Sequence, residues 1–269
     1  MIRAVIFDWA GTTIDYGNQA PAMTIKKTLK QFGIEVTFAD LRQEVGLEPL
    51  IQIKALMGRE DIQKKWYIMH PDMSLEEGIS QIYKWFTRNI MEVLPQIAKV
   101  KAGMPTLISY LRTQGIRFAT TTRYTKEMLD QILPLASEQG FDPFINITAE
   151  DLNRTDCLDS DMISQAMRKL RIRNPRTVIK VGDSPKDILE GKDAGVVTIG
   201  MIEGSSLIGM SQQEFSILPF AKRNSMKNQV AAELEKAGAD YVVENAKDLM
   251  RLIKCQGQFK NVGFRQKEM

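Results

Sequence analysis

A carboxylate that directly follows an apolar run opens the segment Asp8-Trp9-Ala10-Gly11-Thr12-Thr13. The run before it, residues 3–7, predicts a short buried strand, and Gly11 lets the backbone of the following loop approach a ligand closely. At such a place one carboxylate oxygen can attack phosphorus while the other binds a divalent cation. The alternative interpretation is that Asp8 only caps the turn that follows it.

A second group of carboxylates lies in Gly182-Asp183-Ser184-Pro185-Lys186-Asp187. Asp183 and Asp187 straddle the start of a predicted helix, where they can share one cation directly or through water. Magnesium sites in proteins use few carboxylates and several waters. The alternative is plain helix capping by Asp183 or Ser184. Because both acidic segments follow predicted strands, we favour one joint site over two unrelated caps.

A hydroxyl-rich strand end, Thr120-Thr121-Thr122, supplies a third group. A hydroxyl and the neighbouring backbone amides can bind phosphate oxygens at this place. Threonine is also a favoured strand residue. The segment therefore indicates phosphate binding only in combination with the two acidic segments.

Strands and helices alternate along the parts of the chain that carry these groups. Predicted strands cover residues 3–7, 116–121, 144–147, 177–181, 196–200 and 241–243, and predicted helices cover 104–114, 125–138, 160–170, a segment from 184, and 246–255. This alternation predicts parallel βαβ units and an α/β fold with a doubly wound parallel sheet. Ligands bind at the carboxyl ends of such strands, so we expect Asp8, Thr122 and Asp183 to converge on one crevice.

Residues 18–98 form a helical block without a strand candidate. Apolar residues recur in it at helical spacing, and Ser74 with Glu77 shows the pattern of a capping box. We therefore predict a Rossmann-like core domain (1–17 and 99–256) and a smaller all-helical cap domain (18–98) inserted after the first strand. The polar residues 257–269 are predicted to form a flexible tail.

The composition argues against several classes of function. The net charge is +3, from 36 basic and 33 acidic residues, which indicates neither a nucleic-acid nor a membrane partner. No apolar stretch reaches membrane-spanning length, and the N-terminus lacks the layout of a signal peptide. Cys157 and Cys255 provide no disulfide framework, so we expect a cytoplasmic protein. His70, the single histidine, is expected to be an exposed turn residue.

The motifs resemble those of a known family. The DxxGTT segment, the hydroxyl-ended strand and GDxxxD, in this order, are similar to the haloacid dehalogenase superfamily. The segments VIFDWAGTTIDYG, TTTRYTKEMLD, IKVGDSPKDILEG and GMIEGSSLIGMS resemble the phosphonoacetaldehyde hydrolase (phosphonatase) subgroup, over nearly the whole chain up to about residue 254. Ala10 matches the alanine of that subgroup, where most phosphatases of the superfamily carry an acid.

The resemblance implies a role for each matching residue. Asp8 would be the nucleophile that takes the phosphoryl group as an aspartyl phosphate. Asp8, the carbonyl of Ala10 and Asp183 would hold Mg²⁺, with Asp187 supporting the metal shell. Two more residues would meet the substrate: Thr122 would bind phosphate and Tyr124 would line the site. A homodimer through the caps would fit the subgroup.

The cap half of the resemblance is broken. The subgroup uses a cap lysine that forms a Schiff base with the aldehyde, and Pro49 stands at that position after the turn 45–47. Gln52 replaces a histidine of the subgroup. Lys54, one helical turn beyond Pro49, could reach the same crevice, although we favour a surface-facing lysine there.

The phosphate side of the resemblance also departs from the subgroup. Arg123 replaces a small glycine, and Asp156 stands where the subgroup has an arginine, with Arg154 close by. Arg123 either supplies the positive charge lost at Asp156 or is a solvated loop charge. Because residue 10 is alanine, there is no general acid at the usual place. General acid catalysis ordinarily contributes about two to four orders of magnitude to the rate.

Three hypotheses remain open. The first is a magnesium-dependent, phosphonatase-like hydrolase of a small phosphonate or phosphorylated metabolite, acting through an aspartyl phosphate. The second is a true phosphonoacetaldehyde hydrolase that cleaves the C–P bond to acetaldehyde and phosphate with another cap lysine. The third is a binding or regulatory module that has lost catalysis.

Overall fold

The computed structural model describes residues 1–41, 49–152 and 159–255. The chain forms two compact units, one of residues 1–18 with the chain from Ala98 onward, and one of residues 19–97. That these units are separate domains stays a prediction. The predicted tail, 257–269, lies outside the described residues. None of the described helices combines the length and apolarity that a membrane span needs.

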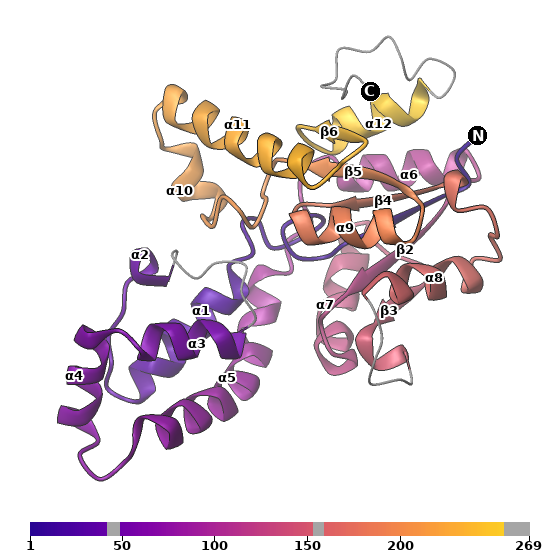
Figure 1. Cartoon of the computed structure of the whole chain (residues 1–269). Helices are drawn as coiled ribbons and strands as arrows, with labels where there is room; N and C mark the ends of the chain where they lie inside the picture. Colours follow the sequence, from indigo (N-terminus) through magenta and orange to yellow (C-terminus); the bar gives the residue numbers. More distant parts are fainter. Residues whose placement is uncertain (42–48, 153–158, 256–269) are drawn as a thin grey trace. The chain divides into compact units, whose positions relative to one another are not determined.

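The core unit is built on a six-stranded sheet in which all neighbouring strands run parallel. Its strands are β1 (Ala4–Phe7), β2 (Arg117–Thr122), β3 (Asn146–Thr148), β4 (Val178–Gly182), β5 (Val197–Met201) and β6 (Tyr241–Val243). They lie in the order β3-β2-β1-β4-β5-β6 (Figure 1). The chain therefore winds outward from β1 in both directions, which confirms the predicted doubly wound sheet and makes β1 the switch point.

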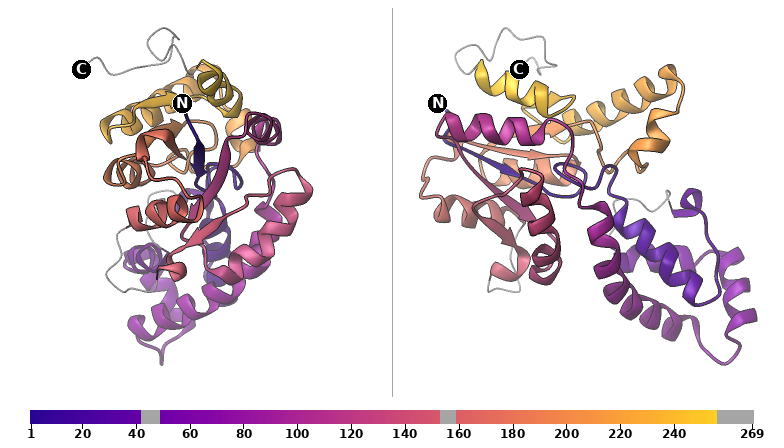
Figure 2. Two further views of the ribbon diagram at one scale, coloured as in Figure 1. Left: turned by 90° about the vertical axis from the view of Figure 1, so that its right-hand side faces the viewer. Right: turned by 180° about the vertical axis from the view of Figure 1, so that it is seen from behind.

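Helices cover both faces of this sheet (Figures 1 and 2). One face carries α8 (Asp159–Lys169), α9 (Pro185–Asp193) and α11 (Phe220–Lys236), and the other carries α6 (Met104–Thr113), α7 (Lys126–Glu138) and α12 (Ala246–Lys254). Buried on both faces, β1 is apolar throughout and β4 is apolar apart from Lys180, as expected of parallel strands.

The apolar core fixes the direction in which Asp8 points. Ile6 packs with Met162 and Ile163 of α8, whereas the ring of Phe7 meets Phe141 at 6.2 Å on the opposite side. Side chains alternate along a strand, so the side chain after Phe7 leaves on the α8 side. The strand thus delivers the Asp8 carboxylate to the carboxyl edge of the sheet.

The second unit consists of helices within its described residues. They are α1 (Ala20–Gln31), α2 (Phe38–Leu41), α3 (Pro49–Met57), α4 (Glu60–Met69) and α5 (Leu75–Ile97). Helix α1 packs along α5. Ser74 and Glu77 form the predicted capping box, since the Glu77 carboxylate accepts from the Ser74 N–H and hydroxyl while Ser74 Oγ accepts from the Glu77 N–H.

The expectation for His70 is wrong. The residue ends α4 and is half-buried, with Nε2 2.8 Å from the carbonyl oxygen of Phe32. Its ring lies 4.3 Å from the ring of Trp66. The imidazole is held by an aromatic neighbour and a backbone carbonyl within the helical unit, so it has a packing role there rather than that of an exposed turn residue.

Two further differences concern the core unit. Strand β3 begins at Asn146 instead of residue 144, and Phe144 is 92% exposed in the loop before it. Helices α10 (Gln212–Ser216) and α11 were not predicted. Helix α11 buries only Val230, Ala231 and Leu234, and so short an apolar face gives no clear helical period.

Candidate active site and metal centre

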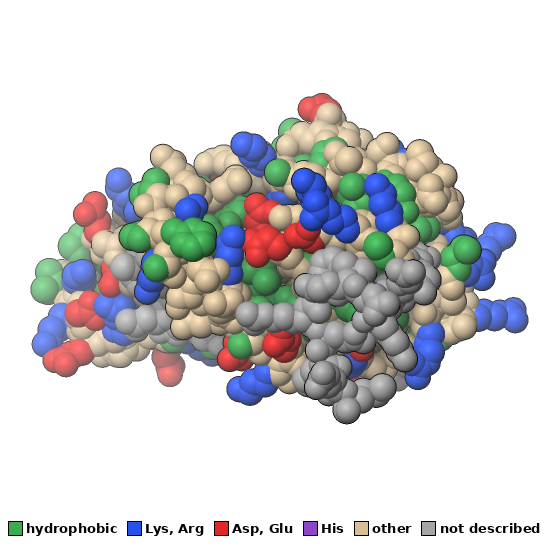
Figure 3. All heavy atoms as spheres, turned by 90° about the horizontal axis from the view of Figure 1, so that it is seen from above, with side chains coloured by type: hydrophobic (Ala, Val, Ile, Leu, Met, Phe, Trp, Pro, Cys, Tyr) green, Lys and Arg blue, Asp and Glu red, His purple; other side chains and the backbone are tan. Residues whose placement is uncertain are grey.

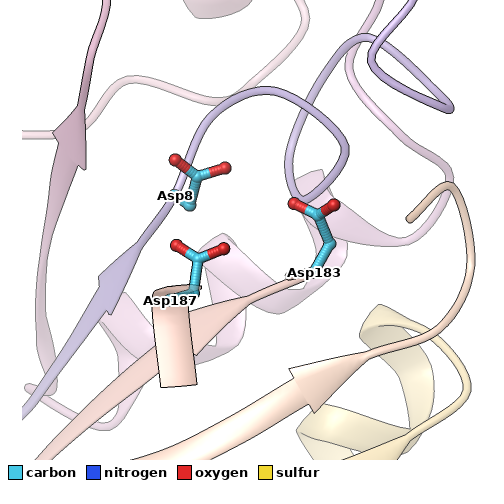
Figure 4. Close-up of side chains that lie close together, drawn as sticks. All are labelled: Asp8, Asp183 and Asp187. Carbon is cyan, nitrogen blue, oxygen red and sulfur yellow. The ribbon is translucent and has the colours of Figure 1, made fainter. Parts of the chain in front are cut away.

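Three carboxylates meet at the carboxyl edge of the sheet (Figure 4). Asp8 follows β1, Asp183 follows β4, and Asp187 lies in the first turn of α9. One ligand oxygen from each lies within 4.8 Å of the others. The pattern of parallel strands thus brings together the residues that the two acidic segments singled out.

The loop after Asp8 is shaped around Asp183. Gly11 has a φ of +81°, and a Cβ at this residue would lie 2.6 Å from Asp183 Oδ2. The Thr12 hydroxyl donates to Asp183 Oδ1 at 2.9 Å, and the Thr13 hydroxyl donates to the Asp8 carbonyl at 3.2 Å. Residue 11 must therefore be glycine for two reasons. Its backbone is left-handed, and the Asp183 carboxylate fills the space that a Cβ would occupy.

Asp183 is held from a second side by the loop that follows β5. The Ser206 N–H donates to its Oδ2 at 2.7 Å, and the Ser205 hydroxyl donates to its backbone carbonyl at 2.7 Å. Both serines lie in the segment GMIEGSSLIGMS, whose likeness to the phosphonatases pointed to this loop without assigning it a role. Together with Thr12, these contacts fix the orientation of the carboxylate.

Asp187 divides its two oxygens between two tasks. Its Oδ2 accepts from the N–H and the hydroxyl of Ser184, at 3.2 and 2.6 Å, and so completes a capping box at the start of α9. Its Oδ1 lies 3.0 Å from Nζ of Lys180. Ser184 is therefore a helix cap, as the alternative interpretation had it, and the same box fixes the Asp187 carboxylate within the acidic group.

Burial and mutual repulsion act on the charges of this group. Burial raises the pKa of Asp8 well above 3.8, and the carboxylate of Asp187 raises it further. Burial together with Asp187 raises the pKa of Asp183 to about 6. For Asp187 burial works in the same direction, but the Lys180 ammonium and nearby hydrogen bonds outweigh it, and its pKa is lowered.

The charge balance fits a divalent cation. Lys180 pairs with one of the three carboxylates, Asp187. The other two, Asp8 and Asp183, keep raised pKa values, which marks negative charge that lacks full compensation. Carboxylate oxygens are hard donors of the kind that a small divalent metal ion prefers, and the part of the Ala10 carbonyl stays a prediction. These residues therefore suit a metal ion.

The predicted phosphate-binding residues follow β2. Thr122 is buried, and its hydroxyl accepts from the N–H of Tyr124 at 3.1 Å. The Tyr124 hydroxyl is buried without a hydrogen-bond partner among the described residues, and burial raises its pKa well above 10, so it stays protonated. Arg123 is about half exposed, with Nη2 3.2 Å from Oε1 of Glu190. Arg123 is thus an anchored charge rather than a freely solvated one.

The remaining predicted residues are placed as follows. Lys54 lies on α3 of the helical unit with an exposed side chain, and its part in the site stays a prediction. Pro49 is the first residue of α3 and offers no amine. The turn 45–47 and the pair Arg154 and Asp156 lie outside the described residues.

Two buried lysines belong to the site although their roles were not predicted. Besides Asp187, Lys180 Nζ reaches the hydroxyl of Thr121 at 2.9 Å. Lys101 Nζ donates to the Gly11 carbonyl at 2.6 Å and to the Glu203 carbonyl. Burial lowers the pKa of Lys101 to about 8, which leaves it protonated at neutral pH.

Only one of these lysines carries a signal in the sequence. Lys180 stands inside the apolar strand Val178–Gly182, where an unpaired charge would be costly. That cost is a reason to look for a carboxylate partner. Lys101 stands in a linker before a glycine, and nothing around it indicates burial.

Comparison with known proteins adds a family. The model of the haloacid dehalogenase-like hydrolases matches residues 2–195. A phosphonoacetaldehyde hydrolase from Lactiplantibacillus plantarum is 37% identical over 252 residues, which cover 94% of this chain and 95% of that protein. Another, from Bacillus cytotoxicus, is 32% identical with the same coverage.

Two solved structures are also similar to this chain. The crystal structure of a phosphonoacetaldehyde hydrolase-like protein from Oleispira antarctica is similar with a TM-score of 0.79 and 31% identity, covering 94% of this chain and 91% of that one. A predicted phosphatase from Clostridium acetobutylicum shares the fold, with a TM-score of 0.63 and 21% identity.

Proposed function

The chain belongs to the haloacid dehalogenase-like hydrolase family, and from this premise we propose that it is a magnesium-dependent, phosphonatase-like hydrolase. It transfers a phosphoryl group from a small phosphonate or phosphorylated metabolite to Asp8 and then to water. The observation that carries this proposal is the convergence of Asp8, Asp183 and Asp187 within 4.8 Å, next to one buried lysine.

The residues divide the work as follows. Asp8, Asp183 and the carbonyl of Ala10 would hold Mg²⁺, and Asp187 would support them through its fixed carboxylate. When bound, the cation neutralises charge on the phosphoryl oxygens and lets Asp8 stay ionised beside them. Thr122 and Arg123, which follow one another at the end of β2, would bind the same oxygens.

The reaction takes two displacements at phosphorus. An oxygen of Asp8 attacks, an Asp8 O–P bond forms, and the bond from phosphorus to the leaving group breaks with its electron pair on the leaving group. Water then attacks the phosphorus of the aspartyl phosphate, which releases phosphate and restores the Asp8 carboxylate. Ala10 cannot protonate the leaving group. Substrates whose leaving group is already a weak base should therefore react fastest.

A phosphate-release assay tests this proposal. Purified protein with Mg²⁺ is screened against phosphonates and phosphate esters, beside Asp8→Asn and a chelator control. We expect turnover that Asp8→Asn lowers at least about a thousandfold, because the nucleophile is lost. Absence of turnover on the whole panel, while beryllofluoride still binds, would favour a binding module instead.

Phosphonoacetaldehyde hydrolysis itself is the second candidate, favoured by the 37% identity to an enzyme of that name. It requires an accessible amine in place of Pro49. Lys101 does not meet this requirement, since it is only 7% exposed and its Nζ is bound to two carbonyls. Lys54 is exposed. Borohydride treatment with phosphonoacetaldehyde should label Lys54 if this candidate is correct, and labelling should disappear in Lys54→Arg.

A further inference from the structure

Lys180 carries its charge inside the central sheet. It stands in β4 with 1% of its side chain exposed, in register with Ile6 of β1. Its Nζ donates to the hydroxyl of Thr121 at 2.9 Å. Thr121 belongs to β2, and β1 lies between β2 and β4. The side chain of Lys180 therefore crosses β1 and ends close to the level of Asp8, the residue that follows this strand.

The ammonium of Lys180 is held from both sides of β1. Besides Thr121 on β2, it contacts Oδ1 of Asp187 at 3.0 Å, whereas Oε2 of Glu190 lies 3.8 Å away, beyond hydrogen-bond distance. Burial lowers the pKa of Lys180, but the carboxylates of Asp187 and Glu190 outweigh this effect, and the pKa is raised. Lys180 is therefore a charged link between β2 and the first turn of α9.

This link completes the fixation of the Asp187 carboxylate. Its Oδ2 already accepts two hydrogen bonds from Ser184. A carboxylate held at one oxygen can still turn about that contact, whereas a second contact, from Lys180 to Oδ1, fixes its plane. Each carboxylate oxygen has about two lone pairs. Oδ1 therefore keeps one for a water of the metal shell, and Mg²⁺ sites retain several such waters.

We propose that Lys180 is a positioning residue: Thr121 holds its ammonium from β2, and the ammonium holds Oδ1 of Asp187 in place for a bound Mg²⁺ and its waters. The inference rests on the proposed function, since it assumes that the acidic group binds this ion. Groups that orient the ligands of a metal ion commonly change its affinity about ten- to a hundredfold. Here such an effect would begin on β2, two strands away from β4.

The variant Thr121→Val separates this role from simpler ones, because it removes a hydroxyl and changes no charge. If Lys180 only neutralises Asp187, the variant should bind Mg²⁺ as the wild type does. If the hydroxyl of Thr121 only satisfies a buried ammonium, the variant should lose stability and nothing else. A positioning role predicts weaker Mg²⁺ binding as well, because the ammonium and with it Oδ1 of Asp187 are released.

The experiment measures the affinity of the full chain for Mg²⁺ by titration calorimetry. Thr121→Val should weaken binding about tenfold, at the lower end of such effects, and Thr121→Ser, which keeps the hydroxyl, should restore the affinity of the wild type. Lys180→Met removes the ammonium, and with it a positive charge that repels a cation. In that background, Thr121→Val should have no further effect, because both changes remove the same interaction.

Thr198→Val is the matched control. Thr198 is fully buried in β5, in register with Lys180, but its hydroxyl donates to Oδ2 of Asp240 at 3.0 Å. The same exchange should therefore lower the melting temperature and leave the Mg²⁺ affinity unchanged. Thermal melting without Mg²⁺ checks that each variant folds. If Lys180→Met does not fold, the comparison of the two Thr121 variants with Thr198→Val still decides.

Several outcomes would overturn the inference. They are unchanged or tighter Mg²⁺ binding by Thr121→Val, binding by Thr121→Ser as weak as that of Thr121→Val, an equal loss in Thr198→Val, or a further loss when Thr121→Val is added to Lys180→Met.

A failure of the proposed function gives a different result. A wild type that binds Mg²⁺ but releases phosphate from no substrate contradicts the enzymatic proposal, and the comparison at Thr121 still tests Lys180. A wild type that does not bind Mg²⁺ overturns the inference together with the metal site.

Discussion

The carboxyl group of Asp183 holds its proton more tightly than an ordinary aspartic acid does. Burial and the neighbouring Asp187 raise its pKa from 3.8 to about 6, and the raised pKa of Asp8 acts in the same direction. Below pH 4 both the folded and the unfolded chain hold the Asp183 proton. Between pH 4 and 6 the unfolded chain releases it more readily, so ionisation costs the folded state free energy, up to about 3 kcal/mol above pH 6.

This cost predicts a stability that depends on pH and on metal together. Without divalent cations, the free energy of unfolding of the wild type should fall between pH 4 and 7 relative to that of Asp183→Asn, whose side chain does not ionise. Added Mg²⁺ should restore the wild type at pH 7, because the cation takes the place of the proton. Urea titrations at several pH values, with Mg²⁺ or chelator, measure the difference. If the free energy of unfolding of the wild type changes with pH in the same way as that of Asp183→Asn, the raised pKa of Asp183 is contradicted.

At the scale of residues, the sequence predicted the groups whose type and spacing are specific. Asp8, Asp183 and Asp187 follow recognisable patterns, and the structure brings them together. Lys101 could not be predicted, because its burial results from contacts with Gly11 and Glu203, both distant in the sequence. Such contacts exist only once strands that are far apart in the chain have paired.

Among the elements, the loop between β1 and the helical unit is the one that shapes the site. It turns at Gly11, where both a left-handed backbone and the absence of a Cβ are needed. Lys101 anchors the same turn through the Gly11 carbonyl. The loop is therefore tied through Lys101 to Glu203, after β5, as well as to Asp183.

A pair of glycine substitutions separates these two requirements. Gly11 and Gly115 both have positive φ, +81° and +66°, but a Cβ at Gly115 meets nothing within 4 Å. Alanine at either residue should cost about 1 kcal/mol of stability from the left-handed backbone. Only Gly11→Ala should also lose Mg²⁺ binding and activity, because its Cβ displaces the Asp183 carboxylate. Melting temperatures with and without Mg²⁺ test this; retained metal binding in Gly11→Ala would be inconsistent with it.

The predictability of an element depended on its periodicity. Strands such as β1 and β4 could be predicted from the sequence because they are buried on both faces and therefore form continuous apolar runs. Strand β3 was placed too early, because exposed Phe144 looks like a strand residue when only its type is considered. Helix α11 was missed because most of its surface is polar.

At the scale of the whole molecule, the helical unit is an insertion between β1 and β2. The two chain segments that lead to and from it meet inside the core unit, where the Lys101 N–H donates to the Thr13 carbonyl at 2.9 Å. The three carboxylates and the complete sheet belong to the core unit.

On the face shown in Figure 3, acidic and basic side chains are interspersed without one continuous field of either sign.

This arrangement predicts that the insertion can be removed. A chain with residues 19–97 replaced by a short Gly/Ser linker should keep its parallel sheet and its stabilisation by Mg²⁺, while it loses substrate selectivity. Circular dichroism and melting curves with and without Mg²⁺ measure both properties. A product without cooperative melting would show that the core unit depends on the helices, and that the two units are not separate domains.

The central position of β1 has a consequence for how the protein is made. Ala4 pairs with Arg117 on one side and with Val178 on the other, so β1 is synthesised well before either of the strands that it pairs with. The helical unit is continuous in sequence and is complete before either partner exists. Contacts so distant along the chain form slowly. A nascent chain therefore carries Asp8 without the other two carboxylates until β4 and the start of α9 have been made, and the candidate site can form only after that.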